Sequence, residues 1–388
     1  MTTPGGGSAR TRVLFCIPQL ERGGPDAVFF NLLGSIDRER FEPILVVTDR
    51  TGGYLDEIPD DVEVVFTDPG RYPVVSLIRI VRRLRPDVVL ATLRMNTTAA
   101  AARPLFPRHT ALICRVANNI SGDLSQQRRS GNNLKTRAIA LSYRTMLLLA
   151  DLVIAQSASM RDDIERTYGL RIARKVMSMP NPVDAERIER RAALGFDEQP
   201  TIGSPQLVSV GRLGYQKGYD LLLPAFARLR ADHPDARLWL VGDGPDRDAL
   251  DAQATDLGIR ASIDLVGFVD NPAPYVAAAD LYVCSSRYEG FSNALAESVA
   301  LGTPAVAPRG AGAGDEIIAA GDGILVDVAT EPALLDAMTR ALTADPPFDP
   351  DHIRASCRQR FSVDSVARRY ETAILDAARR RLPARRSS

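Results

Sequence analysis

The sequence has little that would mark a disulfide-rich or metal-binding protein. Its four cysteines, among 388 residues, are far apart and form no C-x-x-C pair. Free thiols of this kind favour a reducing cytosol over an oxidising compartment. The chain has three histidines, and no Cys/His cluster has the spacing of a zinc site. We therefore expect no metal and no cofactor.

Long apolar runs are also missing. The most membrane-like segment, residues 138–156, is interrupted by Arg144 and Asp151, whereas a spanning helix needs ~20 mostly apolar residues. Residues 1–10 lack the apolar stretch of a signal peptide, so we expect them to form a disordered leader. These features favour a cytoplasmic protein, soluble or peripheral at the inner face of the cell membrane.

The chain has no excess of positive or negative residues: 48 Lys and Arg balance 48 Asp and Glu, so its formal net charge is zero. Because the chain has no net positive charge to attract a polyanion, we expect no nucleic-acid partner. The charges are unevenly distributed: residues 1–180 carry 25 Lys and Arg against 18 Asp and Glu, whereas residues 181–388 carry 23 against 30. A basic half and an acidic half suggest different partners, although scattered solvated charges would give the same count.

What the sequence does have is a repeated alternation of short apolar runs and helical stretches. "TRVLFCIPQL" is followed by a glycine loop, "ERGGPD", and then by the helical "AVFFNLLGSI". Five more runs follow: "EPILVVT", "VEVVFT", "PDVVLAT", "TALICRVA" and "ADLVIAQS". Strands that alternate with helices predict a parallel sheet covered on both faces.

The alternation pauses at residues 179–205, which are rich in proline and polar residues, and then restarts. "QLVSVGRL", "ARLWLVGDG", "IDLVGFV", "ADLYVCSS", "TPAVAP" and "GILVDV" supply a second set of strands. We predict an α/β protein of two doubly wound, Rossmann-like domains that face each other across a cleft. The expected boundaries are 11–182, 183–362 and a C-terminal helix, 363–388, that packs back toward the first domain and ends in a frayed basic tail.

One stretch, "YEGFSNALAES" at 288–298, places two carboxylates at the start of a predicted helix. The amides of a first helical turn are unpaired, which suits an anion or a hydroxyl-rich ligand. Glu289 lies just outside the helix and Glu297 one turn inside it. Two spaced carboxylates with amide donors between them match the hydroxyl clusters of a sugar nucleotide. Alternatively, both acids only decorate a surface turn.

A second stretch, "VGRLGYQKG" at 210–218, places Arg212 and Lys217 in the loop after a strand. Arginine binds a diphosphate through its planar fork and lysine as a point charge. Glycines in the same loop allow the backbone to come close to a ligand. Because this loop and the two glutamates belong to one domain, a donor-binding site is the better interpretation.

Together, these stretches resemble the retaining glycosyltransferases of family 4, which have the GT-B architecture. The marks are "RGGPD", "VGRLGYQKG", "LVGDGPDRDAL", "LVGFVDN" and "YEGFSNALAESVALGTPAVA". The resemblance covers nearly the whole chain and is strongest from about 207 to 330. It implies a metal-independent transferase that moves a sugar from a UDP- or GDP-linked donor to a glycan or lipid-linked glycan, with retention of configuration, in cell-surface polysaccharide synthesis.

The resemblance also implies roles for particular residues. Arg212, Lys217 and Glu289 form the expected catalytic set, with the two cations on the diphosphate and Glu289 on the transferred sugar. Glu297 is expected to bind the donor ribose. The other donor-binding residues are Gly23, Gly24, Gly211, Gly267, Phe268, Gly290, Phe291, Ser292 and Asn293, among which the backbone amides of 291–293 assist Glu289 and the 267–268 loop borders the base.

The chain departs from the family pattern in the N-terminal domain. Many relatives have a histidine where Ala117 stands, so Arg115, Asn118 or Asn119 is expected to take the acceptor side of the sugar site. Asp26 stands where the family commonly has a glutamate. These departures leave two alternatives open: a nucleotide-sugar epimerase of the same fold, and a non-catalytic protein that binds nucleotide sugars.

Residues 126–150 combine five cations with an apolar stripe. One interpretation is a helix that docks on anionic lipid beside a lipid-linked acceptor. The other, slightly favoured by the sequence, is a buried helix with a solvated end.

Overall fold

The computed structural model describes residues 10–21, 24–50, 52–129, 131–196 and 200–381. The chain divides into two compact units, each described here by itself. Unit 1 comprises Met1–Pro182 together with Val363–Ser388, and unit 2 comprises Val183–Ser362. The chain therefore passes from one unit to the other twice, after Pro182 and after Ser362.

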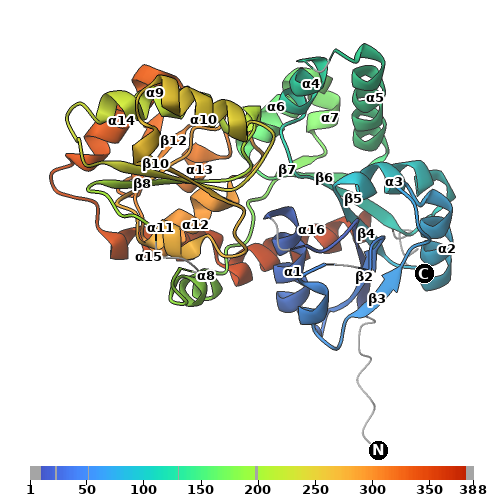
Figure 1. The fold of residues 1–388 in the computed structure, drawn as a ribbon. Helices are drawn as coiled ribbons and strands as arrows, with labels where there is room; N and C mark the ends of the chain where they lie inside the picture. The colour runs from blue at the N-terminus through green and yellow to red at the C-terminus, as the bar shows by residue number, and fades with distance from the viewer. Residues whose placement is uncertain (1–9, 22–23, 51, 130, 197–199, 382–388) are drawn as a thin grey trace, which may run out of the picture. The chain divides into compact units, whose positions relative to one another are not determined.

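Unit 1 is built on a parallel sheet of seven strands in the order β3-β2-β1-β4-β5-β6-β7 (Figure 1). The strands are β1 (Thr11–Ile17), β2 (Phe41–Val47), β3 (Glu63–Phe66), β4 (Val88–Thr92), β5 (Ala111–Val116), β6 (Leu152–Ala155) and β7 (Val176–Ser178). Helices on both faces bury both sides of each central strand. In β1, for example, Phe15 faces one apolar cluster and Leu14 the other. This is why the strands are apolar runs without alternation.

The helices of unit 1 divide between the two faces of the sheet. They are α1 (Gly24–Ser35), α2 (Val74–Leu84), α3 (Arg94–Ala102), α4 (Ile120–Arg129), α5 (Asn133–Leu149), α6 (Ala158–Tyr168), α7 (Leu170–Ala173) and α16 (Val363–Arg381), with 3₁₀ turns at Leu55–Glu57 and Arg103–Leu105. Helices α2 to α7 cover one face, and α1 and α16 cover the other. The last helix of the chain thus completes the core of the first unit.

Helix α16 packs into the core of unit 1 through one side. Val366, Tyr370 and Ile374 are buried against unit 1, while Leu375 is only partly buried. The Glu371 carboxylate accepts a hydrogen bond from the Asp37 amide at 2.9 Å, beyond the end of α1. Packing and hydrogen bonding together hold α16 on the face of the sheet that α1 also covers.

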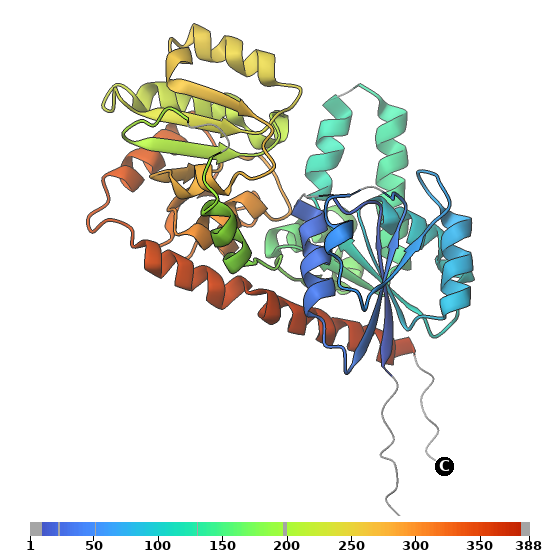
Figure 2. The ribbon, with the colours of Figure 1, turned by 60° about the horizontal axis from the view of Figure 1, so that its bottom comes forward.

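Unit 2 contains a parallel sheet of six strands in the order β10-β9-β8-β11-β12-β13. The strands are β8 (Gln206–Val210), β9 (Arg237–Val241), β10 (Ile263–Gly267), β11 (Leu281–Val283), β12 (Ala305–Pro308) and β13 (Gly323–Val326). The helices are α8 (Ala185–Ala192), α9 (Tyr219–Leu229), α10 (Arg247–Asp256), α11 (Ala273–Ala277), α12 (Asn293–Leu301), α13 (Gly314–Ile317), α14 (Glu331–Leu342) and α15 (Pro350–Phe361), with 3₁₀ turns η3 (Tyr215–Lys217) and η4 (Arg260–Ser262). Helices α9, α10 and α14 cover one face and the others cover the opposite face (Figure 2).

In each sheet the strand order reverses at one point, between β1 and β4 in unit 1 and between β8 and β11 in unit 2. In open α/β sheets, ligands bind outside the carboxyl ends of the strands at such a reversal. The predicted α/β class with two doubly wound units is confirmed, and twelve of the thirteen strands coincide with predicted apolar runs. Strand β7, which has three residues, was not predicted.

Among the residues that the structure describes, no helix is both long enough and apolar enough to span a bilayer.

Candidate functional site

Two loops meet at the strand reversal of unit 2. The first follows β8 and contains Arg212 and Lys217, and the second follows β11 and contains Glu289. Because β8 and β11 are neighbouring parallel strands, their carboxyl ends lie at the same edge of the sheet. The two stretches that the sequence singled out, more than seventy residues apart, are thereby brought together.

The first loop is shaped by two glycines. Gly211 has a φ of +150°, and a Cβ there would lie 2.4 Å from Cε of Lys217, so only glycine lets the lysine cross over the backbone. Gly218 has a φ of +66°, and a Cβ would lie 2.2 Å from the carbonyl oxygen of Ser285. The Ser285 hydroxyl also donates to the Lys217 carbonyl at 2.8 Å. The second loop therefore packs directly against the first.

The centre of the site is an ion pair. Lys217 Nζ lies 2.9 Å from Oε1 of Glu289, and the side chains are 18% and 10% exposed. Ser286 donates a short hydrogen bond to the same carboxylate oxygen. Burial alone would lower the pKa of Lys217, but the Glu289 carboxylate outweighs it and raises that pKa above its ordinary value. Lys217 is therefore a permanently charged ammonium that faces a buried carboxylate.

Arg287 holds the two loops in register. Its guanidinium donates to both carboxylate oxygens of Asp220, at 2.7 and 2.6 Å, and to the Tyr215 carbonyl at 2.8 Å. It also lies 4.2 Å from the centroid of the Tyr215 ring. The hydrogen bond from Arg287 lowers the pKa of the Asp220 carboxyl. Sequence reasoning missed this pair, although Arg287 directly precedes the motif that contains Glu289.

Arg212, the second predicted diphosphate ligand, is exposed. Its guanidinium forms no ion pair or hydrogen bond within the described part of the chain. The loop after β10 is also open to solvent: Gly267 has a φ of +86°, and the Phe268 side chain is 78% exposed. An unneutralised cation and an exposed aromatic ring are thus available to a phosphate group and a nucleotide base.

Helix α12 begins after Glu289, as predicted, with Ser292 at its N-cap. Gly290 and Phe291 are buried, and Asn293 starts the helix. The expectation that the Ser292 amide serves a ligand needs correction, because it donates to the Gly312 carbonyl at 2.9 Å. The Ser292 hydroxyl is buried and has no hydrogen-bond partner among the described residues.

Glu297 lies one helical turn after Asn293 on α12 and is partly buried. Burial raises the pKa of its carboxyl to about 7, while the positive charges of Arg191 and Lys217 act in the opposite direction. No ion pair or hydrogen bond of this carboxylate is found within residues 200–381 or the other described ranges. It is therefore a carboxylate whose oxygens are free to accept hydroxyl hydrogen bonds.

In unit 1, the glycine loop after β1 leads into α1. Gly23 lies outside the described residues, and Gly24 is the first residue of α1. Asp26, in the first turn, is buried, and its carboxylate accepts a hydrogen bond from the Glu21 amide at 2.9 Å. Burial raises the pKa of Asp26 to about 7 against the opposing effect of that hydrogen bond.

The structure corrects the acceptor-side role expected for Arg115. This residue is fully buried in β5, with Nη2 donating to Asn181 at 2.6 Å and Nη1 to Thr92 at 3.3 Å. The sequence placed Arg115 in the apolar run "TALICRVA", and the structure shows that its side chain is enclosed in the core at this strand position.

Asn118 and Asn119 are engaged in building the turn before α4. The Asn119 side chain accepts from the amide of Gly122 at 2.8 Å, which caps the helix. The Asn118 amide group donates to Asp123 at 2.8 Å. Both residues are partly exposed, but their side chains stabilise the helix start rather than extend into open space, which weakens the prediction of an acceptor role.

No group of three or more His, Cys, Asp and Glu side chains arranged to hold a metal ion occurs among the residues described.

Comparisons with known proteins match both halves of the chain. The model of the family described as Glycosyltransferase Family 4 matches residues 22–187, and that of Glycosyl transferases group 1 matches residues 191–359. One relative is the N-acetylgalactosamine-N,N'-diacetylbacillosaminyl-diphospho-undecaprenol 4-alpha-N-acetylgalactosaminyltransferase of Campylobacter jejuni. It is 27% identical, over 85% of this chain and 89% of that protein.

A second relative is the lipopolysaccharide core biosynthesis glycosyltransferase LpsE of Rhizobium meliloti, 39% identical over 32% of this chain. That match spans only about a third (36%) of the length of LpsE. Among solved structures, Anabaena HepE in complex with UDP-glucose superposes with a TM-score of 0.72 at 20% identity, over 95% of this chain and all of HepE. The consecutive family matches and the shared fold agree with the motifs: the chain belongs to the family 4, group 1 glycosyltransferases of GT-B architecture.

Proposed function

We propose that this protein transfers a sugar from a UDP- or GDP-linked donor to a glycan or lipid-linked glycan, with retention of anomeric configuration and without a metal ion. The observation that carries the proposal is the Lys217–Glu289 pair, 2.9 Å apart at the strand reversal of unit 2. A buried carboxylate and a buried ammonium in contact give one site both an oxygen ligand for sugar hydroxyls and a cation for phosphate.

The proposed chemistry follows from where charge develops. When the donor's glycosidic bond breaks, negative charge builds on the diphosphate. Lys217 and the exposed Arg212 stabilise that charge, and the N-terminus of α12 adds the positive end of its dipole. Glu289 orients the sugar, and the acceptor hydroxyl attacks from the face that the diphosphate leaves, passing its proton to the departing phosphate oxygen.

The donor specificity is assigned to two features. The Glu297 carboxylate accepts hydrogen bonds from the ribose hydroxyls, and Phe268 lies against the base. HepE was solved with UDP-glucose, which supports a uridine donor for this fold but leaves guanosine open here. A thermal-shift screen against UDP, GDP and their sugars tests the choice, because a ligand at a hundredfold excess over its Kd stabilises the folded state by ~2.7 kcal/mol.

The acceptor class rests on the relatives. The Campylobacter enzyme is named for a diphospho-undecaprenol-linked acceptor and LpsE for the lipopolysaccharide core. We extend this class, a cell-surface glycan or its lipid-linked precursor, to the present chain. Incubation with purified lipid-linked oligosaccharides and the identified donor, followed by mass spectrometry of the product, tests it.

The decisive variant is Glu289→Gln. We expect transfer to fall by ~10²–10³-fold, as when one group that stabilises a transition state is removed. Nucleotide affinity should be kept or increase, because Lys217 loses its carboxylate partner and offers its full charge to the diphosphate. Rates are measured with saturating donor and the Kd for UDP or GDP by calorimetry.

The matched control is Glu331→Gln, the same chemical change on α14, where the carboxylate pairs with Arg228 near the surface. It should leave both quantities unchanged. Wild-type transfer by the Glu289→Gln protein would refute the assigned role. Incubation of the wild type with nucleotide sugars alone separates the alternatives: an epimer identifies an epimerase, slow hydrolysis a transferase, and binding without turnover a non-catalytic protein.

We also propose peripheral contact with an anionic membrane through α5. Leu134, Leu141 and Leu148 recur every seven residues and are 78%, 64% and 49% exposed. The exposed cations Lys135, Arg137 and Arg144 lie on the same helix. The other interpretation, a buried helix, is correct only for the other side of α5, where Met146 and Leu147 are part of the core. An exposed leucine stripe with cations fits an anionic lipid surface.

A further inference from the structure

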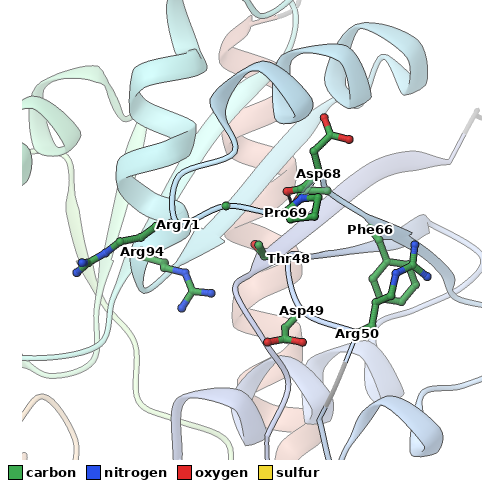
Figure 3. A pocket seen from close by; sticks show the side chains of 10 residues that line it. Thr48, Asp49, Arg50, Phe66, Asp68, Pro69, Arg71 and Arg94 are labelled. Carbon is green, nitrogen blue, oxygen red and sulfur yellow. Dashed lines mark hydrogen bonds between the residues drawn. The ribbon is translucent and has the colours of Figure 1, made fainter.

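Unit 1 contains a pocket that no part of the proposed donor site uses. It lies at the carboxyl ends of β2, β3 and β4, where the sheet of unit 1 opens to solvent (Figure 3). Its volume is about 860 Å³, and its lining includes Thr48, Arg50, Phe66, Asp68, Arg71 and Arg94. A volume of ~300–1,000 Å³ is usual for a small-molecule site. The pocket is large enough for one or two sugar units.

Three arginines, Arg50, Arg71 and Arg94, dominate the charge of this pocket; we call it the arginine pocket. None of their guanidinium groups forms an ion pair or hydrogen bond with another residue that the structure describes. Arg50 lies 4.3 Å from the centroid of the Phe66 ring, which holds its side chain against the pocket wall. Three unneutralised cations around one cavity create a local excess of positive charge.

The carboxylates nearby do not cancel this excess. Asp49 and Asp68 also line the pocket, so the cations outnumber the anions. Asp68 lies 3.7 Å from Arg79, outside the lining, and points away from Arg71 and Arg94 in Figure 3. In that view the Arg71 side chain extends to the left and the Arg94 side chain to the right. Only the Asp68 carboxylate is turned away from these two arginines, because Asp49 lies between Arg94 and Arg50 in the same view.

Arg94 is held in place by the chain around it. It is the first residue of α3, and the preceding Leu93 has a φ of +52°, an uncommon conformation for a residue with a side chain. Nε of Arg94 is buried and has no hydrogen-bond partner among the described residues. A buried N–H without an acceptor is rare in folded proteins. An anion bound in the pocket would accept from this guanidinium.

We propose that the arginine pocket binds an anionic group, a phosphate or a carboxylate, on the acceptor saccharide. The proposal rests on the proposed function, because it makes this pocket part of acceptor recognition. Guanidinium groups bind both anions through paired, charge-assisted hydrogen bonds. The positive N-terminus of α3 adds to the anion-binding character of the pocket.

The test is calorimetric titration of the full chain with glucose 6-phosphate, glucuronate and glucose. We expect at least one of the two anionic sugars to bind about tenfold more tightly than glucose, and the stronger of them identifies the anion.

The double variant Arg71→Gln/Arg94→Gln should weaken that binding by about tenfold or more, since charge-assisted bonds are lost. The matched control, Arg171→Gln/Arg174→Gln, removes two exposed arginines of unit 1 outside the pocket and should leave the affinity unchanged. Asp49→Asn should strengthen binding, an effect that misfolding cannot produce.

Three results would overturn the proposal: equal affinity for all three sugars, equal affinity of the pocket variant and the wild type, or loss of anion binding in Arg212→Gln instead. The last would place the anion in unit 2. Thermal unfolding of each variant shows that it is folded. Failure of the wild type to bind UDP or GDP would contradict the proposed function alone, because the pocket is tested by the sugar anions.

Discussion

At the residue scale, Glu297 is the group whose ionisation the structure makes most testable. Its carboxyl has a pKa of about 7 in the folded protein against an ordinary value of 4.5. The folded state therefore binds the proton more tightly than the unfolded chain does. This contributes stability that is complete below pH 4.5 and is lost as the pH rises to about 7.

We accordingly predict that Glu297→Gln stabilises the free protein at pH 8 but not near pH 4.5. At pH 8 the substitution removes a partly buried charge, a gain of about 1–2 kcal/mol, smaller than the full pKa shift implies because water screens a partly exposed group. Thermal unfolding of both proteins at the two pH values measures it. An identical difference at both pH values would show that the carboxyl has an ordinary pKa.

The sequence identified some residues of the site and could not identify others. Lys217 and Glu289 were found because both lie in short motifs, and the structure places them in contact. Arg287 and Asp220 were missed because a charge pair between a loop and the start of α9, sixty-seven residues apart in the sequence, leaves no local pattern. Arg115 was misjudged because an arginine is seldom fully buried without a partner, whereas here Asn181, distant in the sequence, provides a buried partner.

At the scale of elements, the loops after β8 and β11 act as one unit because Arg287 joins them. We predict that Arg287→Ala weakens nucleotide binding by about tenfold, since η3 and Lys217 lose their support. Asp220→Ala should weaken it less, because Arg287 still donates to the Tyr215 carbonyl. Exposed ion pairs contribute only ~0–1 kcal/mol, so the melting temperature should change little in either variant.

Calorimetric Kd values for the two variants, together with that of Arg287→Lys, measure this effect. Partial recovery in Arg287→Lys is expected, because lysine retains one charge but not the paired hydrogen bonds. Unchanged nucleotide affinity in Arg287→Ala would show that the loops keep their arrangement without it.

Helix α5 provides a second prediction at this scale. The double variant Leu141→Ser/Leu148→Ser should reduce binding to vesicles that contain phosphatidylglycerol, because it removes apolar area that enters the lipid surface. Co-sedimentation measures the bound fraction. Leu194→Ser changes a leucine of unit 2 that is still more exposed, at 78%, and should have no effect. Equal binding to vesicles of phosphatidylcholine alone would contradict the contribution of the cations.

The elements themselves were largely readable from the sequence, and their order in the sheets was not. Strands buried on both faces are visible as apolar runs such as "ARLWLVGDG". The three residues of β7, Val176–Ser178, are too few to show a pattern. The reversal of strand order beside β1 and β8 depends on which strands pair with each other. The sequence of one apolar run does not contain that information.

At the scale of the whole molecule, the stability of unit 1 depends on the last helix of the chain. Ile374 of α16 is fully buried in the cluster that α1 and the sheet share. We predict that Ile374→Ala costs about 2–5 kcal/mol, the usual range for large-to-small changes in a core. Arg368→Ala, on the exposed side of the same helix, should cost less than about 0.5 kcal/mol.

Urea unfolding followed by circular dichroism measures both variants. If the two units unfold separately, only the transition of unit 1 should move in Ile374→Ala. If both variants lowered the free energy of unfolding equally, the loss would come from weakened helix formation in α16 and not from the packing of its buried face.

The double passage of the chain between the units has a consequence for protein synthesis. Unit 2 is continuous in sequence, and its ends meet where the Val183 amide donates to the Phe361 carbonyl at 2.8 Å, so it can close as soon as it has left the ribosome. Unit 1 is begun first but lacks α16 until residues 363–381, which follow unit 2 in the sequence, have been synthesised. Unit 1 therefore keeps one face of its sheet uncovered while unit 2 is synthesised and folds. During that interval the nascent chain is most exposed to aggregation and to chaperones.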